Sequence, residues 1–293
     1  MDLPEGLDWV RGSPAGRTWL AALPTWLNEC AERWSLRVGP PFRQAYASLA
    51  LPAHLPDGTA AVLKLQYPDE ESRYEADALA HWDGDAAIRL LAHDPGRRAL
   101  LLERCQPGTP LHDLPPDRAL DVVIGLLPRL WRPAGAPFTP LAQEAAGWID
   151  RMPRAWERAA RPYERRLLDA ALDLLTGLAS SQGEQVLVNQ DLHAGNILAA
   201  DALTADRGPW LAIDPKPLTG EREFSVVPIV RGPELGHSPA AVRHRLHRLS
   251  TELGLDPERV RGWTIGHTLA WSLADDTVVP EKIEVVRWLL DAD

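Results

Sequence analysis

Residues 186–198 have the sequence VLVNQDLHAGNIL, in which a short polar loop separates two apolar runs. The loop carries Asp191, His193 and Asn196. Further along the chain, a third apolar run is followed at once by Asp214. Short apolar runs bounded by polar residues are typical of buried strands. The sequence therefore predicts that these polar side chains lie in loops at strand ends.

This set of side chains matches what phosphoryl transfer requires. The reaction needs a carboxylate that orients the attacking hydroxyl and accepts its proton, and oxygen ligands that hold Mg²⁺ on the phosphates. Asp191 is the predicted catalytic base, and Asn196 and Asp214 are the predicted Mg²⁺ ligands. The spacing Asp-x-x-x-x-Asn is also that of the protein-kinase catalytic loop.

Two other interpretations of this loop stay open. Taken singly, an Asp or Asn in a loop is most often a turn former or a cap. Asp191 and His193 together could hold the metal of a hydrolase, but no further His or Cys lies at ligand spacing. We therefore expect His193 to brace the loop.

Lys64 interrupts the apolar run at residues 60–66. A buried ammonium group is costly unless it has an ionic partner, which nucleotide phosphates and a helix carboxylate would provide. Glu75, on the next predicted helix, is the expected partner, and Glu71 one turn earlier remains an alternative. Had Lys64 stood alone, an edge-strand lysine facing solvent would be the preferred interpretation.

Lysine is scarce in this chain, since only three of the 31 basic residues are lysines. They are Lys64, Lys216 and Lys282. Where an arginine-rich chain keeps a lysine, the ammonium group itself is expected to be required.

The order of patterns along the chain predicts an α+β, bilobal organisation. The first hundred residues read as helix, strand, strand, helix, strand, strand, and the sequence after the linker at residues 105–110 is mainly helical. We expect a small β-rich N-terminal lobe over 1–104, a hinge at 105–110 and a larger helical lobe over 111–293. The expected helices are 17–35, 70–82, 117–130, 141–160, 162–180, 239–253, 257–273 and 280–291; the expected strands are 45–51, 60–66, 86–92 and 99–103, with further β structure in 185–199 and 209–213.

The nucleotide-binding elements of the N-terminal part carry weaker signals. Residues 101–105 lie where a kinase hinge would present backbone groups to adenine, so Glu103 and Cys105 are predicted at the ATP site by position alone. Residues 39–42, Gly-Pro-Pro-Phe, lie where a glycine-rich loop would cover the phosphates, but they lack the G-x-G-x-x-G pattern and are interpreted as a turn.

Composition excludes several classes of protein. With 293 residues, 45% hydrophobic and 25% charged, the chain has enough apolar material for a core and no apolar run near the roughly 18 residues of a membrane helix. The acidic N-terminus lacks the features of a signal peptide, so we expect a cytoplasmic protein.

The formal charge of −10 argues against binding to nucleic acid and suits a cationic ligand or a metal-bound phosphate. Cys30 and Cys105 are expected to be reduced thiols, and a monomer is favoured.

Taken together, these residues resemble the aminoglycoside phosphotransferase group of the protein-kinase-like superfamily, and within it the streptomycin 6-kinase and hydroxyurea phosphotransferase family. The similarity extends over about residues 30–275. Besides the Asp191 loop, it includes EADAL at 75–79, ALLLER at 99–104 and IDPKPLTGE at 213–221, of which Asp-Pro-Lys-Pro replaces the Asp-Phe-Gly of protein kinases. Two positions depart from the pattern. Asn189-Gln190 stands where many relatives have His-Gly, and Ser225 follows Phe224 where relatives commonly have Asp.

The resemblance implies a bilobal kinase fold, ATP with Mg²⁺ as cofactors, and transfer of the γ-phosphoryl group to a hydroxyl of a small molecule. It makes Asp191 the base, Asn196 and Asp214 the metal ligands, and Lys64 the phosphate lysine paired with Glu75.

The acceptor suggested by the resemblance is a cationic aminoglycoside such as streptomycin. Hydroxyurea or a metabolite is an alternative acceptor, and a nucleotide-binding pseudokinase without turnover is the alternative from another functional class. A polycationic acceptor needs carboxylates beyond those that hold Mg²⁺. The predicted acceptor-binding residues are Glu221, Glu223, Trp271, Asp275 and Asp276.

Overall fold

The computed structural model describes residues 4–43, 46–200, 207–274 and 277–291. The chain divides into two compact units. Unit 1 comprises residues 1–108 together with 200–209, and unit 2 comprises residues 109–199 and 210–293. The division after Gly108 falls within the stretch expected to be a hinge, and the assignment of 200–209 to unit 1 is a feature that sequence patterns did not predict.

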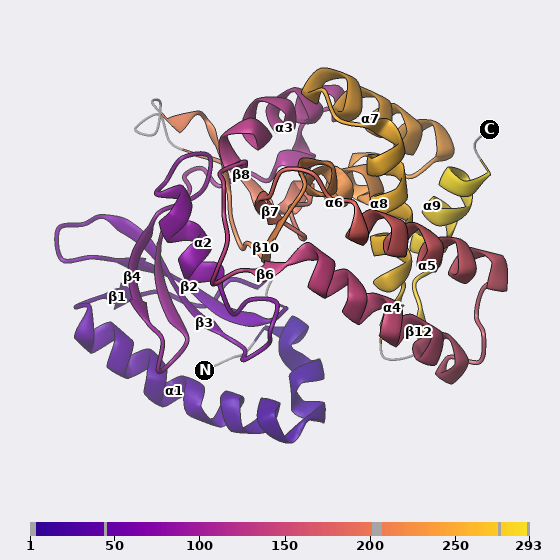
Figure 1. The fold of residues 1–293 in the computed structure, drawn as a ribbon. Helices are drawn as coiled ribbons and strands as arrows, with labels where there is room; N and C mark the ends of the chain where they lie inside the picture. Colours follow the sequence, from indigo (N-terminus) through magenta and orange to yellow (C-terminus); the bar gives the residue numbers. More distant parts are fainter. Residues whose placement is uncertain (1–3, 44–45, 201–206, 275–276, 292–293) are drawn as a thin grey trace. The chain divides into compact units, whose positions relative to one another are not determined.

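Unit 1 is built on an antiparallel sheet with the strand order β1-β2-β3-β5-β4 (Figure 1). The central strand β3 pairs with β2 on one side and with β5 on the other. The strands are β1 (Arg37–Val38), β2 (Ser48–His54), β3 (Ala60–Gln66), β4 (Leu90–Asp94) and β5 (Ala99–Glu103); the helices are η1 (Glu5–Gly12), α1 (Pro14–Arg33) and α2 (Glu75–Trp82).

One face of this sheet is covered by α1. Trp19 and Leu23 of this helix belong to the same buried cluster as Leu49 of β2 and Leu63 of β3. The helix begins at Pro14, earlier than its apolar pattern predicted, because the side chain of Ser13 accepts a hydrogen bond from the Gly16 amide. Since neighbouring strand residues point to opposite faces, Lys64 and Leu63 lie on different faces of β3.

Further expected boundaries in unit 1 were wrong, and the strand expected over 45–51 is one of them, because it extends over Ser48–His54. The strand expected over 86–92 begins at Leu90, because Ala86 has φ +59°, which is outside the β region. The helix expected over 70–82 begins at Glu75.

Unit 2 is mainly helical, and α8 lies at its centre among α5, α6, α7 and α9 (Figure 1). Most residues of α8 are buried, including Trp263 and His267. Gly266 lets α8 approach α5, because a Cβ atom at this position would lie 2.5 Å from Leu175. The principal helices are α3 (Pro116–Leu130), α4 (Leu141–Arg158), α5 (Arg165–Ser180), α6 (Val227–Arg231), α7 (Pro239–Leu253), α8 (Pro257–Ala270) and α9 (Pro280–Leu290).

Short strands carry the loops that matter for function in unit 2. The strand β7 pairs antiparallel with β10, which also pairs in parallel with β6, and β8 pairs antiparallel with β9. These strands are β6 (Thr139–Pro140), β7 (Val186–Asn189), β8 (Ile197–Ala199), β9 (Trp210–Ala212), β10 (Pro217–Gly220), β11 (Leu273–Ala274) and β12 (Thr277–Val278); the short helices are η2 (Leu111–Asp113), η3 (Ala194–Asn196), η5 (Arg222–Val226) and η6 (Pro233–Leu235).

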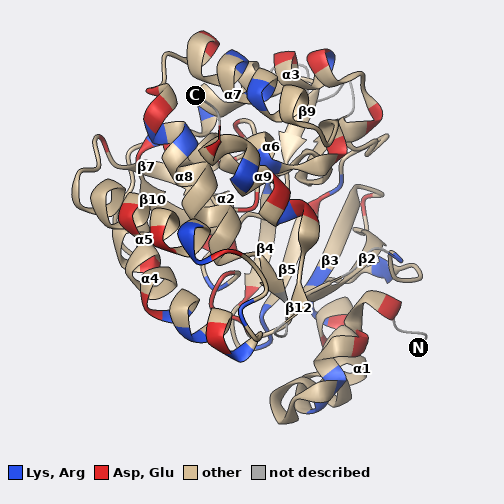
Figure 2. Cartoon of the chain, turned by 90° about the vertical axis from the view of Figure 1, so that its right-hand side faces the viewer, with Lys and Arg blue, Asp and Glu red and all other residues tan. Residues whose placement is uncertain are grey.

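Charged residues of both signs are mixed along the outer helices (Figure 2). Several form ion pairs one helical turn apart, such as Arg154 with Asp150 and Arg165 with Asp169. Within the described ranges, no helix is long and apolar enough to cross a membrane. The predicted fold class, a β-rich N-terminal part and a mainly helical C-terminal part, is confirmed.

Candidate active site

Two loops of unit 2 bring the predicted catalytic residues together. One loop runs from β7 to β8 and carries Asp191, and the other runs from β9 to β10 and carries Asp214. Backbone hydrogen bonds join the two loops at both ends: the amide of Gln190 donates to the carbonyl of Lys216 (3.1 Å), and the amide of Ile213 donates to that of Asn196 (2.9 Å). Residues separated by 17 to 26 positions are therefore held side by side.

Asn189 holds the two loops in register. Its side-chain Oδ1 accepts hydrogen bonds from the amides of Asp191 and Lys216, both at 3.0 Å, and only 3% of the residue is exposed. One buried acceptor thus fixes the backbone on either side of the site. The sequence marked Asn189 only as a departure from the family pattern, and the structure shows that the asparagine is itself a brace.

Asp191 is paired with Lys216. The ammonium Nζ lies 3.1 Å from Oδ2 of Asp191, and each side chain is 20% exposed. A carboxylate in this position keeps contact with solvent while its orientation is restrained by a charge-assisted contact. The sequence marks Lys216 by the scarcity of lysine and by its place in Asp-Pro-Lys-Pro, but it does not reveal this pairing, because a contact across 25 positions has no local signature.

Asn196 and Asp214 form a donor set that fits Mg²⁺. The Nδ2 group of Asn196 donates to the backbone carbonyl of Asp191 (2.9 Å), which assigns the other amide atom, Oδ1, as the atom that can coordinate a cation. Asp214 has φ +50°, a left-handed conformation that non-glycine residues seldom adopt and that often occurs at functional sites. Mg²⁺ is usually bound by one or two protein oxygens together with phosphate oxygens and water. The two residues therefore suit Mg²⁺ carried by a nucleotide.

His193 contacts both its own loop and η6. Its Nδ1 lies 3.1 Å from the Gly195 amide and 3.1 Å from Oε1 of Glu234. One nitrogen cannot accept from an amide and donate to a carboxylate at once, so the two contacts belong to different protonation states. Burial lowers the pKa of His193, but the Glu234 carboxylate and the charge of Asp191 outweigh it, and the pKa is raised overall.

In unit 1, Lys64 is paired with Glu75, the first residue of α2. The Nζ atom lies 2.7 Å from Oε2 of Glu75, and Gln66 donates to the same oxygen, also at 2.7 Å. Glu75 is fully buried and Lys64 is 6% exposed. Of the two carboxylates that the sequence left open, Glu75 is therefore the one that faces this lysine, and Gln66 is a further partner that the sequence did not indicate.

The carboxylate of Glu103 is bound by an arginine. Nη1 and Nη2 of Arg207 lie 2.7 and 2.8 Å from the two carboxylate oxygens, and Arg207 also donates to the carbonyls of Gly84 and Ala87. Burial raises the pKa of Glu103, but Arg207 outweighs it and the net shift is downward. Burial raises the pKa of Cys105 to about 12, so this thiol is protonated at neutral pH. Any nucleotide contact of these two residues is therefore expected from their backbone groups.

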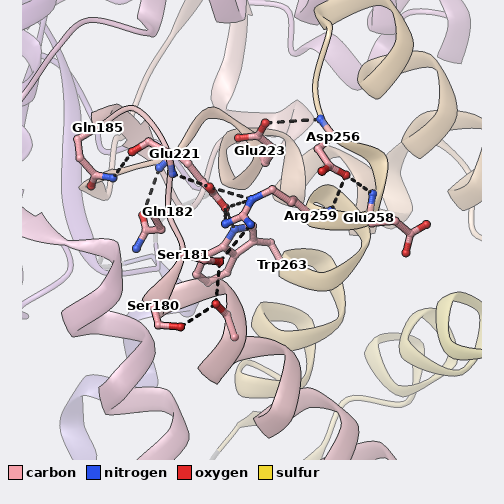
Figure 3. A network of polar contacts seen from close by, with 12 residues as sticks. Ser180, Ser181, Gln182, Gln185, Glu221, Glu223, Asp256, Glu258, Arg259 and Trp263 are labelled. Carbon is pink, nitrogen blue, oxygen red and sulfur yellow. Dashed lines mark hydrogen bonds and ion pairs between the residues drawn. The ribbon is translucent and has the colours of Figure 1, made fainter.

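The structure contradicts the expected contact of Glu221 with an acceptor (Figure 3). Glu221 is 2% exposed, and its carboxylate accepts hydrogen bonds from Nε and Nη2 of Arg259 (2.8–3.0 Å), from the amide of Gly183 (3.2 Å) and from Nε1 of Trp263. A buried carboxylate with this many donors is a structural ion pair. Sequence analysis missed this because every partner is distant along the chain.

The remaining acceptor candidates do not form one group. Glu223 accepts a weak hydrogen bond from the Asp256 amide (3.5 Å), next to the start of α8, whereas Trp271 caps the other end of this helix. Fourteen helical residues place these two ends about 20 Å apart. Asp275 and Asp276 lie outside the described residues.

Trp271 lies among cationic side chains of unit 2. Nζ of Lys216 is 5.0 Å from the ring centroid, and the guanidinium carbon of Arg231 is 5.1 Å from it. Lys282 donates to the backbone carbonyl of Trp271 (2.6 Å). The Trp271 ring, predicted to bind the acceptor, is thus in contact with cations of the protein itself, and Lys216 contacts both this ring and Asp191.

A cavity of about 380 Å³ lies next to the C-terminal end of α8. The residues that line it are Trp148, Arg151, Met152, Ala155 and Arg158 of α4 together with Tyr163, Leu269, Ala270 and Leu273. The buried His267 ring contacts both Trp148 (4.9 Å) and Trp271 (4.7 Å). Trp148, which lines the cavity, therefore contacts His267, and His267 in turn contacts Trp271, the tryptophan beside Lys216.

Replacing Glu221 should destabilise unit 2. Glu221→Ala leaves Arg259 and Trp263 without their acceptor, and we expect a loss of about 2–4 kcal/mol in the free energy of unfolding, since Arg259 keeps some contact with solvent. The control is Glu223→Ala, which removes only a 3.5 Å hydrogen bond and should cost below about 0.5 kcal/mol. Urea unfolding of both variants measures the difference, and equal midpoints would show that the buried pair contributes nothing.

Comparison with known proteins is consistent with this geometry. Residues 33–275 match the model of the family described as aminoglycoside/hydroxyurea antibiotic resistance kinase. A hydroxyurea phosphotransferase from Kitasatospora aureofaciens is 41% identical over 95% of this chain and 82% of its own length. A streptomycin 6-kinase from Streptomyces glaucescens is 39% identical over 92% of this chain and 89% of its own length.

Solved structures with the same fold are much more distant in sequence. The choline kinase of Streptococcus pneumoniae superposes with a TM-score of 0.64 at 14% identity, covering 92% of this chain and 99% of that chain. An aminoglycoside 2′-phosphotransferase crystallised with GDP gives a TM-score of 0.62 at 14% identity, covering 91% and 96%. These likenesses confirm the kinase-like fold.

The predicted family and the predicted class of enzyme, a phosphotransferase with an alcohol group as acceptor, are thus both confirmed. The family match covers most of the chain, and two curated relatives are 41% and 39% identical to it over most of their length. The chain belongs to the aminoglycoside/hydroxyurea antibiotic resistance kinase family.

Proposed function

We propose that this enzyme transfers the γ-phosphoryl group of ATP to a hydroxyl of a small antibiotic of the streptomycin type. The observation that carries the proposal is the joined pair of loops in unit 2: Asp191 and Asn196 share one loop, which is hydrogen-bonded to the loop that carries Asp214. Phosphoryl transfer requires a base and, close to it, residues that bind the metal ion of the nucleotide. Membership of a kinase family supports the same chemistry.

Each residue has a defined task in this reaction. Asp191 orients the acceptor hydroxyl and takes its proton as the oxygen attacks the γ-phosphorus; the bond from the γ-phosphorus to the bridging oxygen breaks, and ADP leaves with that electron pair. Mg²⁺, held by Asn196 and Asp214, would neutralise charge on the phosphate oxygens. Lys64, restrained by Glu75, is the proposed contact to the phosphates in unit 1. Backbone groups at Glu103 and Cys105 are the proposed contacts to adenine.

The choice of acceptor rests on relatives and on charge. The two relatives at 41% and 39% identity are named for different acceptors, so identity alone does not separate hydroxyurea from streptomycin. The formal charge of −10 favours attraction of a polycationic aminoglycoside. Asp275 and Asp276 are the proposed carboxylates for its cationic groups, and Glu221 is not among them because it is buried. Hydroxyurea is the alternative acceptor.

A panel of acceptors tests the proposal. The purified protein is incubated with ATP, Mg²⁺ and streptomycin, another aminoglycoside or hydroxyurea, and each acceptor is examined by mass spectrometry for the gain of one phosphoryl group. We expect phosphorylated streptomycin. Modification of hydroxyurea alone would overturn the aminoglycoside assignment and leave the kinase assignment intact. Nucleotide binding without modification of any acceptor would favour a pseudokinase.

The cavity next to α8 is the proposed place for an uncharged part of the acceptor, because Trp148, Met152 and Leu269 line it and the two lining arginines would repel a cationic group. Ala155→Trp should fill this cavity and raise the acceptor KM by about 10-fold or more, while the KM for ATP stays within about 2-fold. Arg154→Trp, the control, adds the same side chain at a neighbouring exposed position of α4. An unchanged acceptor KM in Ala155→Trp would place the acceptor elsewhere.

A further inference from the structure

The lysines of this chain are concentrated around the proposed catalytic groups. Lys64 faces Glu75 in unit 1. In unit 2, Lys216 is paired with Asp191, and Lys282 donates a hydrogen bond to the backbone carbonyl of Trp271. The remaining basic residues are arginines. Of the three lysines, Lys216 and Lys282 are the two that no step of the proposed reaction has used so far.

Lys216 and Lys282 come from different elements and meet on Trp271. Lys216 follows Asp214 in the loop before β10, and its Nζ lies 3.1 Å from Asp191 and 5.0 Å from the Trp271 ring centroid. Lys282, in the first turn of α9, donates to the Trp271 carbonyl and lies 6.0 Å from the same centroid. Trp271 thus places two ammonium groups near the catalytic carboxylate.

Keeping Lys282 at this place has a cost. Burial and the nearby Arg231 and Lys216 lower the pKa of Lys282 to about 8, although the charge of Asp191 acts in the opposite direction. A basic residue exposed to solvent would not carry this cost of burial and repulsion. Cations held close together repel one another, and a bound anion would offset that repulsion.

We propose that Lys216 and Lys282 bind the γ-phosphoryl group of the nucleotide and stabilise its charge during transfer. This inference rests on the proposed function, because it assigns the ligand of the same site. In the transfer step, the acceptor oxygen forms a bond to the γ-phosphorus, its proton goes to Asp191, and the bond to the bridging oxygen breaks with the electron pair remaining on ADP. Both lysines stay protonated, so they contribute charge and hydrogen bonds without exchanging atoms.

The same arrangement influences which part of the acceptor reaches Asp191. Ammonium or guanidinium groups of an aminoglycoside would be repelled by Lys216 and Lys282, whereas a hydroxyl would not. Positive groups of the acceptor are therefore directed away from the base.

Nucleotide binding tests this assignment without an acceptor. Dissociation constants for ADP and for the non-hydrolysable ATP analogue adenylyl imidodiphosphate are measured with Mg²⁺ by calorimetry, for the wild type, Lys282→Met and Lys216→Met. Methionine keeps the length of the side chain and removes its charge. We expect each variant to bind the analogue roughly 10-fold or more weakly and to bind ADP within about 2-fold of the wild type, since only the analogue has the third phosphate.

Two further variants sharpen the comparison. Arg287→Met removes one positive charge from the exposed side of the same helix α9 and should leave both constants unchanged. Lys282→Arg keeps the charge and should recover part of the preference for the analogue. Retained ADP binding shows that a variant is folded, and Lys216→Met, on a different segment, gives the answer if Lys282→Met does not fold.

The outcomes separate the two proposals. Equal losses for ADP and the analogue, or no loss for either in both lysine variants, would overturn the assignment of these lysines while leaving the kinase function in place. A wild-type protein that binds neither nucleotide would overturn the proposed function, and the lysine assignment with it.

Discussion

Asp191→Asn should lower kcat by about 10²–10⁴-fold while nucleotide affinity stays within about 2-fold of the wild type. The amide keeps the size of the side chain, and its Oδ1 can still accept from Lys216, which lies 3.1 Å from the native carboxylate. It cannot accept the proton of the acceptor hydroxyl. The change therefore removes the base and leaves the surrounding loops in place.

Steady-state kinetics with calorimetric nucleotide binding measure both quantities. The matched control is Asp169→Asn, which alters an exposed ion pair on α5 and should leave kcat unchanged. An Asp191→Asn enzyme that keeps more than about a tenth of wild-type turnover would mean that another group is the base.

Lys64→Met is expected to have the second largest effect, on stability and on nucleotide binding. The carboxylate of Glu75 is fully buried, and the change removes its ammonium partner. Of the two side chains that bind this carboxylate in the Lys64–Gln66–Glu75 cluster, the Gln66 amide remains. Removing one member of a buried ion pair costs about 3–5 kcal/mol. Nucleotide affinity should fall as well, because the proposed phosphate contact is lost.

The companion variant Lys64→Arg separates charge from shape. Its guanidinium group is longer and planar, and a site closed by Glu75 and Gln66 cannot accommodate it without moving α2. We expect weaker nucleotide binding or slower turnover despite the conserved charge. Arg37→Met, on the exposed edge strand β1, is the control. If Lys64→Arg matched the wild type in urea unfolding and in kinetics, Lys64 would lie outside the phosphate site.

Much of the fold was predictable because local patterns coincide with the final elements. The helices over 117–130 and 280–291 and the strands over 60–66 and 99–103 have periodic apolar residues and clear turn or proline boundaries, and the structure has α3, α9, β3 and β5 there. Boundaries failed where a single backbone conformation decides the end of an element, as at Ala86.

The chemistry of the site was predictable only to the extent that it is encoded in spacing. Asp191, Asn196 and Asp214 lie next to the ends of short strands, and the antiparallel pairs β7–β10 and β8–β9 bring these strand ends together. The pairing of Asp191 with Lys216, of Glu103 with Arg207 and of Glu221 with Arg259 depends on tertiary packing across 25 to 104 positions. No local pattern marks such contacts, and a buried Glu221 has the same sequence signature as an exposed one.

The most direct test of the central claim, transfer of a phosphoryl group from ATP by the Asp191 centre, follows the phosphoryl group itself. The protein is incubated with Mg²⁺, streptomycin or hydroxyurea, and ATP labelled with ¹⁸O in the γ-phosphoryl group, and products are analysed by mass spectrometry. We predict an acceptor that carries the labelled phosphoryl group in the same amount as the ADP formed, and a yield lower by about 100-fold or more in the same time with Asp191→Asn. Formation of ADP with labelled inorganic phosphate and an unmodified acceptor, or equal product from Asp191→Asn, would contradict the claim.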